Sequence, residues 1–133
     1  MLIGMTLISF ILSQAVPADP VTANLGEQAA ANPGFAVFTN AGCGGCHTFT
    51  PAKSNGTTGP SLNDVTQDFT AAKAAGKTKA TDLAGFIRES IINPNAYVAK
   101  GFAPGIMPQS FGSSLSKKQL DDLVGYLAKG GGG

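Results

Sequence analysis

The sequence predicts an all-α fold in which short helices alternate with long loops. Two segments in the second half of the chain repeat apolar side chains every three or four residues, the period of an amphipathic helix. Good capping residues precede these segments, and no stretch alternates apolar and polar residues as a half-buried strand does. The 18 glycines and 8 prolines indicate that long stretches are neither helix nor strand.

The first helix of the folded domain is predicted to begin at Pro33, because Asn32 is a good N-cap and proline suits the first helical position. This helix should run to about Ala41, with Val37 and Phe38 facing inward. A tight turn and a glycine- and proline-punctuated loop should follow.

The middle of the chain gives weaker signals. Residues 42–47 read as the turn and residues 48–63 as the loop. Residues 64–80 are ambiguous, with a short helix expected around residues 69–75.

Two clearer helices complete the domain. Thr81 or Asp82 can cap the first of them, the Asn93 and Pro94 pair should stop it, and residues 95–115 should form a long loop. Its apolar stripe contains Leu83, Phe86, Ile87 and Ile91.

The last helix should start at Ser116, with Gln119 completing a capping box, and end at Gly130. Its apolar stripe contains Leu120, Leu123, Val124 and Leu127.

The N-terminal segment, Met1 to Ala18, contains no charged side chain. As a helix it would span about 27 Å, close to the ~30 Å hydrocarbon core of a membrane. It is either a secretory signal peptide or a retained membrane anchor. The first basic residue is Lys53, so the basic region that opens a signal peptide is missing, which favours the anchor.

The chain therefore divides into four parts. Residues 1–18 form the anchor or signal-like segment, and residues 19–31 a linker or short surface helix. Residues 32–130 form the folded domain, and residues 131–133 a glycine tail.

The composition excludes two classes of protein and suggests a cofactor. Charged residues make up 13% and the net charge is +1, which argues against a nucleic-acid-binding protein and against a disordered chain. A small, loop-rich domain buries little apolar surface, so a disulfide, a metal or a large cofactor should help to stabilise it.

The residues that carry chemistry lie together in the motif Cys43-Gly44-Gly45-Cys46-His47, which contains both cysteines and the single histidine. Cys-x-x-Cys-His is the signature of c-type haem attachment. The two thiols add to the vinyl groups at one edge of the porphyrin, and the histidine becomes the proximal iron ligand. The motif thus predicts one covalent haem c.

A structural disulfide, a zinc site and a thioredoxin-type redox pair all fit the motif poorly. A disulfide across two residues would stabilise little. A structural zinc site needs four Cys or His ligands, and this chain has three. A thioredoxin-type pair would follow a strand, whereas a helix is predicted before this motif. A chance match is the remaining alternative.

The distal ligand is predicted by counting. There is no second histidine, and Met1 and Met5 lie in the apolar N-terminal segment, which leaves Met107 as the thioether candidate. Met107 could instead be core filler, with Lys100 as the ligand or the distal site open. His/Met ligation raises the reduction potential and fills both axial positions, so we expect an electron carrier and not an enzyme.

Residues 33–129 resemble the class I cytochrome c family, in its bacterial mono-haem branch. Gly34, Phe38 and Tyr126 fit its two crossing terminal helices, and Met107-Pro108 its distal loop. The resemblance implies three to five helices around one haem. It also implies that the carbonyl of Pro60, in Gly59-Pro60-Ser61-Leu62, orients His47.

Residues 92–111 resemble haem domains of respiratory complexes more closely. They are similar to the cytochrome c domain fused to some oxidase second subunits, whose copper-binding cysteines this chain lacks, and to the mono-haem subunit of alternative complex III. Arg88 or Tyr97 could bind a haem propionate, although Arg88 is equally expected to be a surface residue of its helix. Phe102 and Phe111 flank the Met107 loop and would pack on the haem.

The function we expect is electron transfer by a membrane-anchored subunit of a respiratory or photosynthetic complex. Its partners would be redox proteins or other subunits, with the haem domain on the periplasmic face, because haem attachment occurs outside the cytoplasm. From residue 32 on, nine basic residues face six acidic ones, a net charge of about +3, so electrostatic steering should be weak. The alternatives are a soluble periplasmic shuttle and a ligand-binding haem protein or enzyme.

Overall fold

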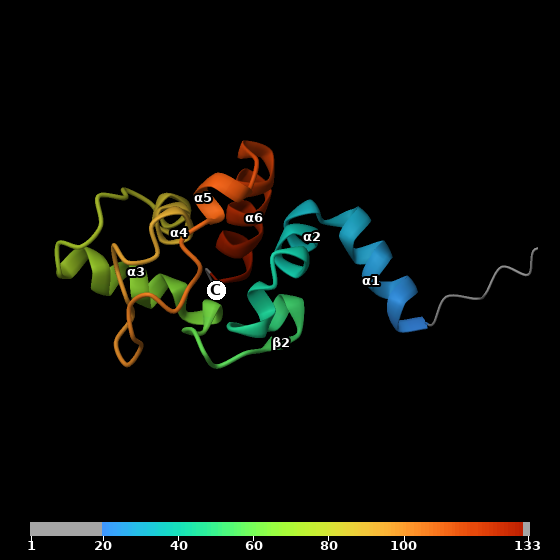
Figure 1. The fold of residues 1–133 in the computed structure, drawn as a ribbon, viewed down its shortest axis with the longest axis horizontal. Coiled ribbons are helices and arrows are strands. Elements are labelled where there is room, and N and C mark those ends of the chain that lie inside the picture. The colour runs from blue at the N-terminus through green and yellow to red at the C-terminus, as the bar shows by residue number, and fades with distance from the viewer. Residues whose placement is uncertain (1–19, 132–133) are drawn as a thin grey trace, which may run out of the picture.

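The computed structural model describes residues 20–131, which form a mostly helical structure (Figure 1). This part of the chain contains six α-helices, and five of them follow residue 32, where three to five were predicted. The sixth is α1, which occupies the segment interpreted as a linker or short surface helix, whereas α5 lies in residues 95–115, which were predicted as loop. The helices are α1 (Pro20–Ala31), α2 (Pro33–Asn40), α3 (Val65–Ala74), α4 (Leu83–Ile92), α5 (Phe111–Ser114) and α6 (Lys117–Gly130).

Helix α2 begins as predicted and crosses α6. The side-chain oxygen of Asn32 accepts the N–H of Phe35 at 3.2 Å, and Val37 and Phe38 are buried. The backbones of α2 and α6 touch at Gly34, where an added Cβ would lie 2.3 Å from the Asp122 carbonyl oxygen. The crossing brings α2, which leads directly into the haem motif, against the longest helix of the domain.

An aromatic cluster stabilises this crossing. Tyr126 of α6 makes edge-to-face contacts with Phe35 and Phe38 of α2, at centroid distances of 6.1 Å each, and with Phe49 at 5.3 Å. Such pairs contribute about 0.5–1.5 kcal/mol beyond the area they bury. Tyr126 thus packs where the family resemblance implied an aromatic between the two helices.

Residues 48–55, predicted as loop, contain a minimal hairpin. Strands β1 (Thr48–Phe49) and β2 (Ser54–Asn55) are antiparallel, with Phe49 opposite Ser54. Two residues per strand are too few for an alternating pattern, which is why no strand was predicted here. Three 3₁₀ turns complete this region: η1 (Cys43–Gly45), η2 (Thr50–Ala52) and η3 (Leu62–Asp64).

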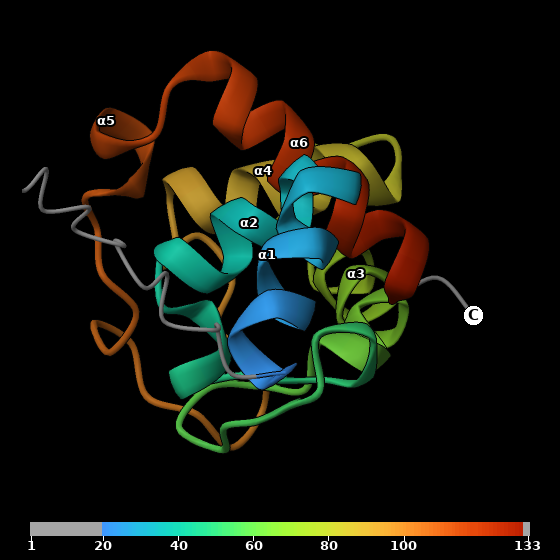
Figure 2. The same ribbon diagram turned by 90° about the vertical axis from the view of Figure 1, so that its right-hand side faces the viewer.

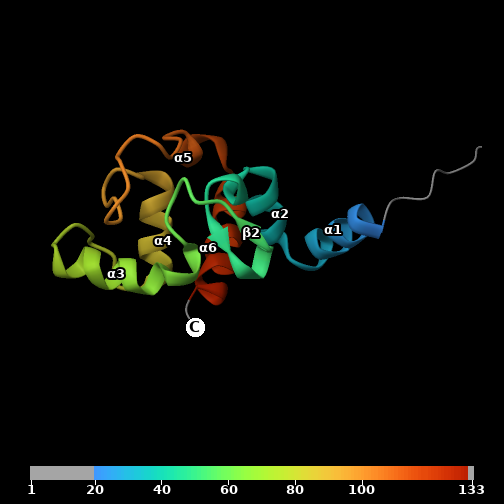
Figure 3. The same ribbon diagram turned by 90° about the horizontal axis from the view of Figure 1, so that it is seen from below.

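Helices α3 and α4 lie beside each other at the end of the structure opposite α1 (Figures 1 and 3). α3 starts at Val65, four residues before the predicted start, because η3 leads directly into it. Of the two predicted caps of α4, Asp82 is the one used, since its carboxylate accepts the N–H of Gly85 at 2.7 Å. α4 ends at Ile92, immediately before the predicted stop.

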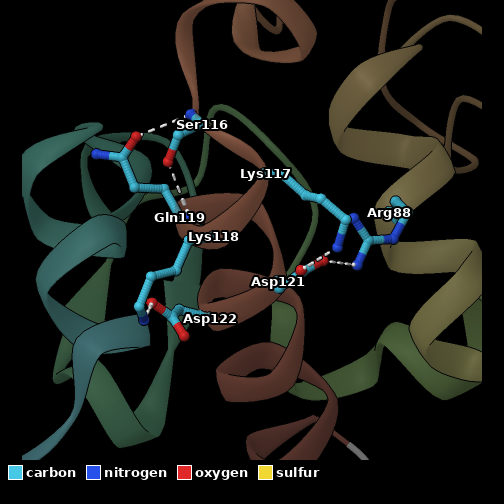
Figure 4. Close-up of polar contacts among 7 residues, drawn as sticks. All are labelled: Arg88, Ser116, Lys117, Lys118, Gln119, Asp121 and Asp122. Carbon is cyan, nitrogen blue, oxygen red and sulfur yellow. Dashed lines mark hydrogen bonds and ion pairs between the residues drawn. The ribbon is translucent and has the colours of Figure 1, made fainter.

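Helix α6 carries the predicted capping box. Ser116 accepts the N–H of Gln119 at 3.2 Å, and the Gln119 side chain accepts the N–H of Ser116 at 2.9 Å (Figure 4). Leu123, Val124 and Leu127 of its apolar stripe are buried. Gly131, assigned to the glycine tail, is also buried, and its carbonyl accepts the Thr66 hydroxyl at 3.0 Å.

The N-terminal part of the described chain is α1, which extends away from the other helices (Figures 1 and 3). Its main packing partner is α2. Among residues 20–131, no helix is both long enough and apolar enough to cross a membrane. The anchor predicted for residues 1–18 lies outside the described residues.

Candidate haem site

A large cavity opens beside the Cys-x-x-Cys-His motif. It encloses about 1400 Å³ of empty space, including the part that is open to solvent. Its walls come from the motif, the Gly59–Pro60 turn, helices α4 and α6 and the loop after α4. The apolar stripes of the two helices form its floor through Phe86, Ile87, Ile91, Leu123 and Leu127.

His47 lines the cavity and is fixed by the chain that follows it. Its Nδ1 lies 2.7 Å from the carbonyl oxygen of Pro60. Because a carbonyl only accepts, Nδ1 carries the proton, and the lone pair of Nε2 is left for an iron ion. This is the contact that the family resemblance implied.

Gly59 lets the imidazole lie directly on the backbone. An added Cβ there would lie 2.5 Å from Cε1 and 2.8 Å from Nδ1 of His47, closer than atoms can approach. Glycine is thus required by the ring beside it.

Backbone hydrogen bonds hold the motif itself. The N–H of His47 donates to Cys43 O at 3.0 Å, and the N–H of Gly59 donates to Cys46 O at 2.8 Å. Gly42 precedes the turn at φ +75°, a conformation that glycine adopts without strain. The Ser54 hydroxyl of β2 donates to His47 O at 2.9 Å, so the hairpin also supports the motif.

The partly buried thiol of Cys43 lacks the lowered pKa of a redox-active cysteine. Both cysteines are free, and burial raises the pKa of Cys43 to about 11. Reactive thiols in Cys-x-x-Cys redox motifs instead have lowered pKa values. Within residues 20–131, no group of three or more His, Cys, Asp and Glu side chains is placed to hold a metal ion.

Met107 lines the same cavity from the loop between α4 and α5. It is half-buried, whereas Ile106 beside it is 58% exposed. Lys100, the alternative ligand, is exposed and does not line this cavity; it borders a neighbouring groove instead. Of the two candidate ligands, only Met107 therefore lies where it could reach an iron ion bound in the cavity.

The structure brings together all but one of the other predicted site residues. Pro60, Tyr97, Phe102 and Phe111 line the cavity. Arg88 does not: it points from α4 toward α6 and pairs with Asp121 at 2.6 Å (Figure 4). Arg88 therefore has the surface position that was the alternative for it, and its contact with a haem propionate stays a prediction.

Two polar residues of the cavity wall were not predicted as site residues. Asp68 of α3 lines the cavity, and burial, together with the nearby Asp64 carboxylate, raises its pKa. The segment around it has no clear helical pattern, so its orientation was unpredictable. Asn95 also lines the cavity; in the sequence it stands out only as part of the stretch that resembles respiratory haem domains.

The site fits a covalently held haem. The cavity is walled mainly by apolar side chains, both thiols lie at its edge, and an imidazole and a thioether enter it. This donor set is the one that c-type haem iron uses. A helical fold around such a site defines a small c-type haem protein.

The comparison with known families agrees with this class. Residues 31–130 match the family model for cytochrome c, and the chain belongs to the cytochrome c family. A comparison with curated proteins found no match. Membership implies covalently bound haem c and haem-based electron transfer.

Proposed function

We propose that this protein is a one-electron carrier with a single haem c, ligated by His47 and Met107. The observation that carries the proposal is that both side chains line one largely apolar cavity with both cysteines at its edge. Cys43 and Cys46 would hold the haem through thioether bonds. The bound haem supplies a one-electron iron couple.

The protein residues set the properties of that couple. Pro60 O fixes the tautomer and orientation of His47 and increases its basicity as a ligand. Met107 on the other side would raise the potential and close the iron to peroxide, oxygen and other small ligands. With both axial positions filled, the iron would have no open position for a substrate, which is the chemistry of an electron carrier.

This proposal can be tested on the protein produced with a c-type haem maturation system. We expect an intact mass that shows one covalently bound haem, and a redox titration that follows a single reversible one-electron curve. Two haems, or no covalent haem, would contradict it.

The Met107→Ala variant tests the distal ligand. We expect it to retain covalent haem but to have a markedly lower reduction potential, because the thioether is lost. The control is Lys100→Ala, which should keep the wild-type potential since Lys100 lies outside the cavity. An unchanged potential in Met107→Ala would refute the assignment, and a shift in Lys100→Ala alone would favour a lysine ligand.

We further propose that the protein is a membrane-anchored, class I mono-haem subunit of a respiratory or photosynthetic complex, similar to the mono-haem subunit of alternative complex III. Its haem domain would lie on the periplasmic face and exchange electrons with protein partners. The uncharged residues 1–18 and the low net charge of the domain support this proposal. The intact mass of the protein isolated from membranes tests it, because loss of the residues before Asp19 would instead identify a soluble shuttle.

A further inference from the structure

The loop that carries Met107 is not held by its own backbone. Within the described residues, no backbone-to-backbone hydrogen bond involves residues 103–109. The nearest such bonds lie at the two ends of this segment, from Phe102 N–H to Ala99 O and from Ser113 N–H to Ser110 O. The loop runs along the outside of the molecule (orange, between α4 and α5 in Figure 2). Something other than backbone pairing must therefore place Met107.

Two side-chain amides supply the missing hydrogen bonds. The Asn95 Oδ1 accepts the N–H of Gly105 at 2.9 Å. The Asn95 Nδ2 donates to Gln109 Oε1 at 3.3 Å, and Gln109 Nε2 donates to the carbonyl oxygen of Met107 itself at 2.8 Å. These three hydrogen bonds form a connected chain that holds the loop at Gly105, Met107 and Gln109.

Asn95 is itself fixed to the core of the protein. It follows Pro94, which is buried, at the end of α4. The turn there is closed by Asn93 N–H donating to Glu89 O at 2.8 Å and by Ala96 N–H donating to Asn93 O at 3.0 Å. The amide chain thus connects the loop to a helix whose apolar side chains are part of the cavity floor.

We infer that Asn95 and Gln109 are positioning residues that hold the Met107 thioether toward the cavity and so set how readily it leaves the iron. The inference rests on the proposed function, in which Met107 is the distal ligand. Neither side chain touches the iron; both act through the backbone of the loop. Residues 103–109 have no backbone pairing, so removing one of the two side-chain amides should loosen all seven residues of this segment, in addition to breaking one hydrogen bond.

The test uses ferric holoprotein and measures the affinity of imidazole, which can bind the iron only when Met107 has left. We expect Asn95→Ala and Gln109→Ala each to bind imidazole about tenfold more tightly than the wild type, as expected when one hydrogen bond of ordinary strength is lost. Asn95→Asp keeps the acceptor for Gly105 but loses the donor to Gln109, so its effect should be smaller.

The matched control is Asn24→Ala. Asn24 Oδ1 accepts Gln28 Nε2 at 2.7 Å on α1, so this variant removes the same kind of exposed amide pair away from the cavity. It should leave imidazole binding unchanged. Amide hydrogen exchange gives an independent readout: Gly105 N–H should exchange about tenfold faster in Asn95→Ala, with the midpoint of global unfolding unchanged.

The Met107→Ala variant separates failure of this inference from failure of the proposed function. Wild-type imidazole affinity in both Asn95→Ala and Gln109→Ala, with tight binding in Met107→Ala, would overturn the inference and leave Met107 as the ligand. Equal imidazole affinity in the wild type and Met107→Ala would overturn Met107 ligation, and the inference with it. Should Asn95→Ala fail to fold, Gln109→Ala carries the same test.

Discussion

The two sides of the haem cavity are built in different ways. On the His47 side, backbone groups within a short stretch of chain supply the hydrogen bonds: the Gly59 N–H donates to Cys46 O at 2.8 Å, and Pro60 O accepts from the imidazole at 2.7 Å. On the Met107 side, residues 103–109 have no backbone pairing within the described chain and depend on two exposed side-chain amides.

This difference indicates how the two ligands behave. The imidazole is fixed by close packing on Gly59 and by its hydrogen bond to Pro60 O, so it should be rigid. The thioether lies on a segment that can open locally without unfolding the domain, because local stability follows the density of buried contacts and protected hydrogen bonds. We therefore expect substitutions on the His47 side to affect folding, and substitutions on the Met107 side to affect ligand exchange.

The largest effect is expected where the His47 side rests on the helix crossing. In Gly34→Ala, the new Cβ would lie 2.3 Å from both Asp122 O and Tyr126 Cβ, so α2 and α6 must separate. We expect a loss of about 3 kcal/mol in the free energy of unfolding, measured with denaturant.

The control for this variant is Gly125→Ala on α6, where no atom lies within 4 Å of the new Cβ. Alanine there should instead stabilise by about 0.5–1 kcal/mol, since glycine is unfavourable inside a helix. Equal effects of the two variants would contradict the close crossing.

A somewhat smaller effect is expected at the imidazole itself. Gly59→Ala places a Cβ 2.5 Å from the His47 ring, so the ring must leave its bond with Pro60 or the loop must move. We expect a loss of about 2 kcal/mol in the free energy of unfolding and an altered haem spectrum.

Gly45→Ala, within the Cys-x-x-Cys-His motif, is the control, because its Cβ would meet no atom within 4 Å. It should change the free energy of unfolding by less than about 0.5 kcal/mol. A Gly59→Ala variant with wild-type spectrum and stability would show that the His47 side is less rigid than we infer.

The smallest effect concerns the ion pair between α4, which leads to the Met107 loop, and α6, which crosses α2. Hydrogen bonds from Lys117 and Arg88 lower the pKa of Asp121. A carboxylate with a lowered pKa in the folded state stabilises above its unfolded pKa of about 3.9, and that stabilisation is lost as the pH falls through the folded value.

Asp121→Asn should therefore lower the free energy of unfolding slightly at neutral pH. Below about pH 4, this free energy should fall less steeply with decreasing pH than in the wild type, as urea titrations at several pH values would show. Asp122→Asn, which removes only a pair with Lys118 within α6, is the control and should not alter the contact to α4. A large loss at neutral pH would contradict the minor role assigned to this exposed pair.

Features set by neighbouring residues were predictable from the sequence. The caps at Asn32, Asp82 and Ser116 are local hydrogen bonds, and the helices start where these residues stand. The haem motif is likewise local, because two thiols and a histidine at fixed spacing define one chemistry. The family resemblance implied that the carbonyl of Pro60 orients His47, and the structure contains this hydrogen bond.

Features set by distant partners were not predictable. Arg88 faces Asp121, 33 residues away, and nothing in its own helix distinguishes an ion pair from a haem contact. The hairpin at residues 48–55 is too short to leave a pattern. Asn95 reaches Gly105 and Gln109 across a loop without periodicity, so only the three-dimensional structure reveals that amide chain.

The optical spectrum of the ferric holoprotein tests the central claim, ligation by His47 and Met107, most directly. Ligation by these two residues predicts a low-spin spectrum with a weak near-infrared sulfur-to-iron band that disappears in Met107→Ala, and slow carbon monoxide binding in the ferrous protein. A high-spin ferric spectrum, or rapid carbon monoxide binding by the folded wild type, would contradict it.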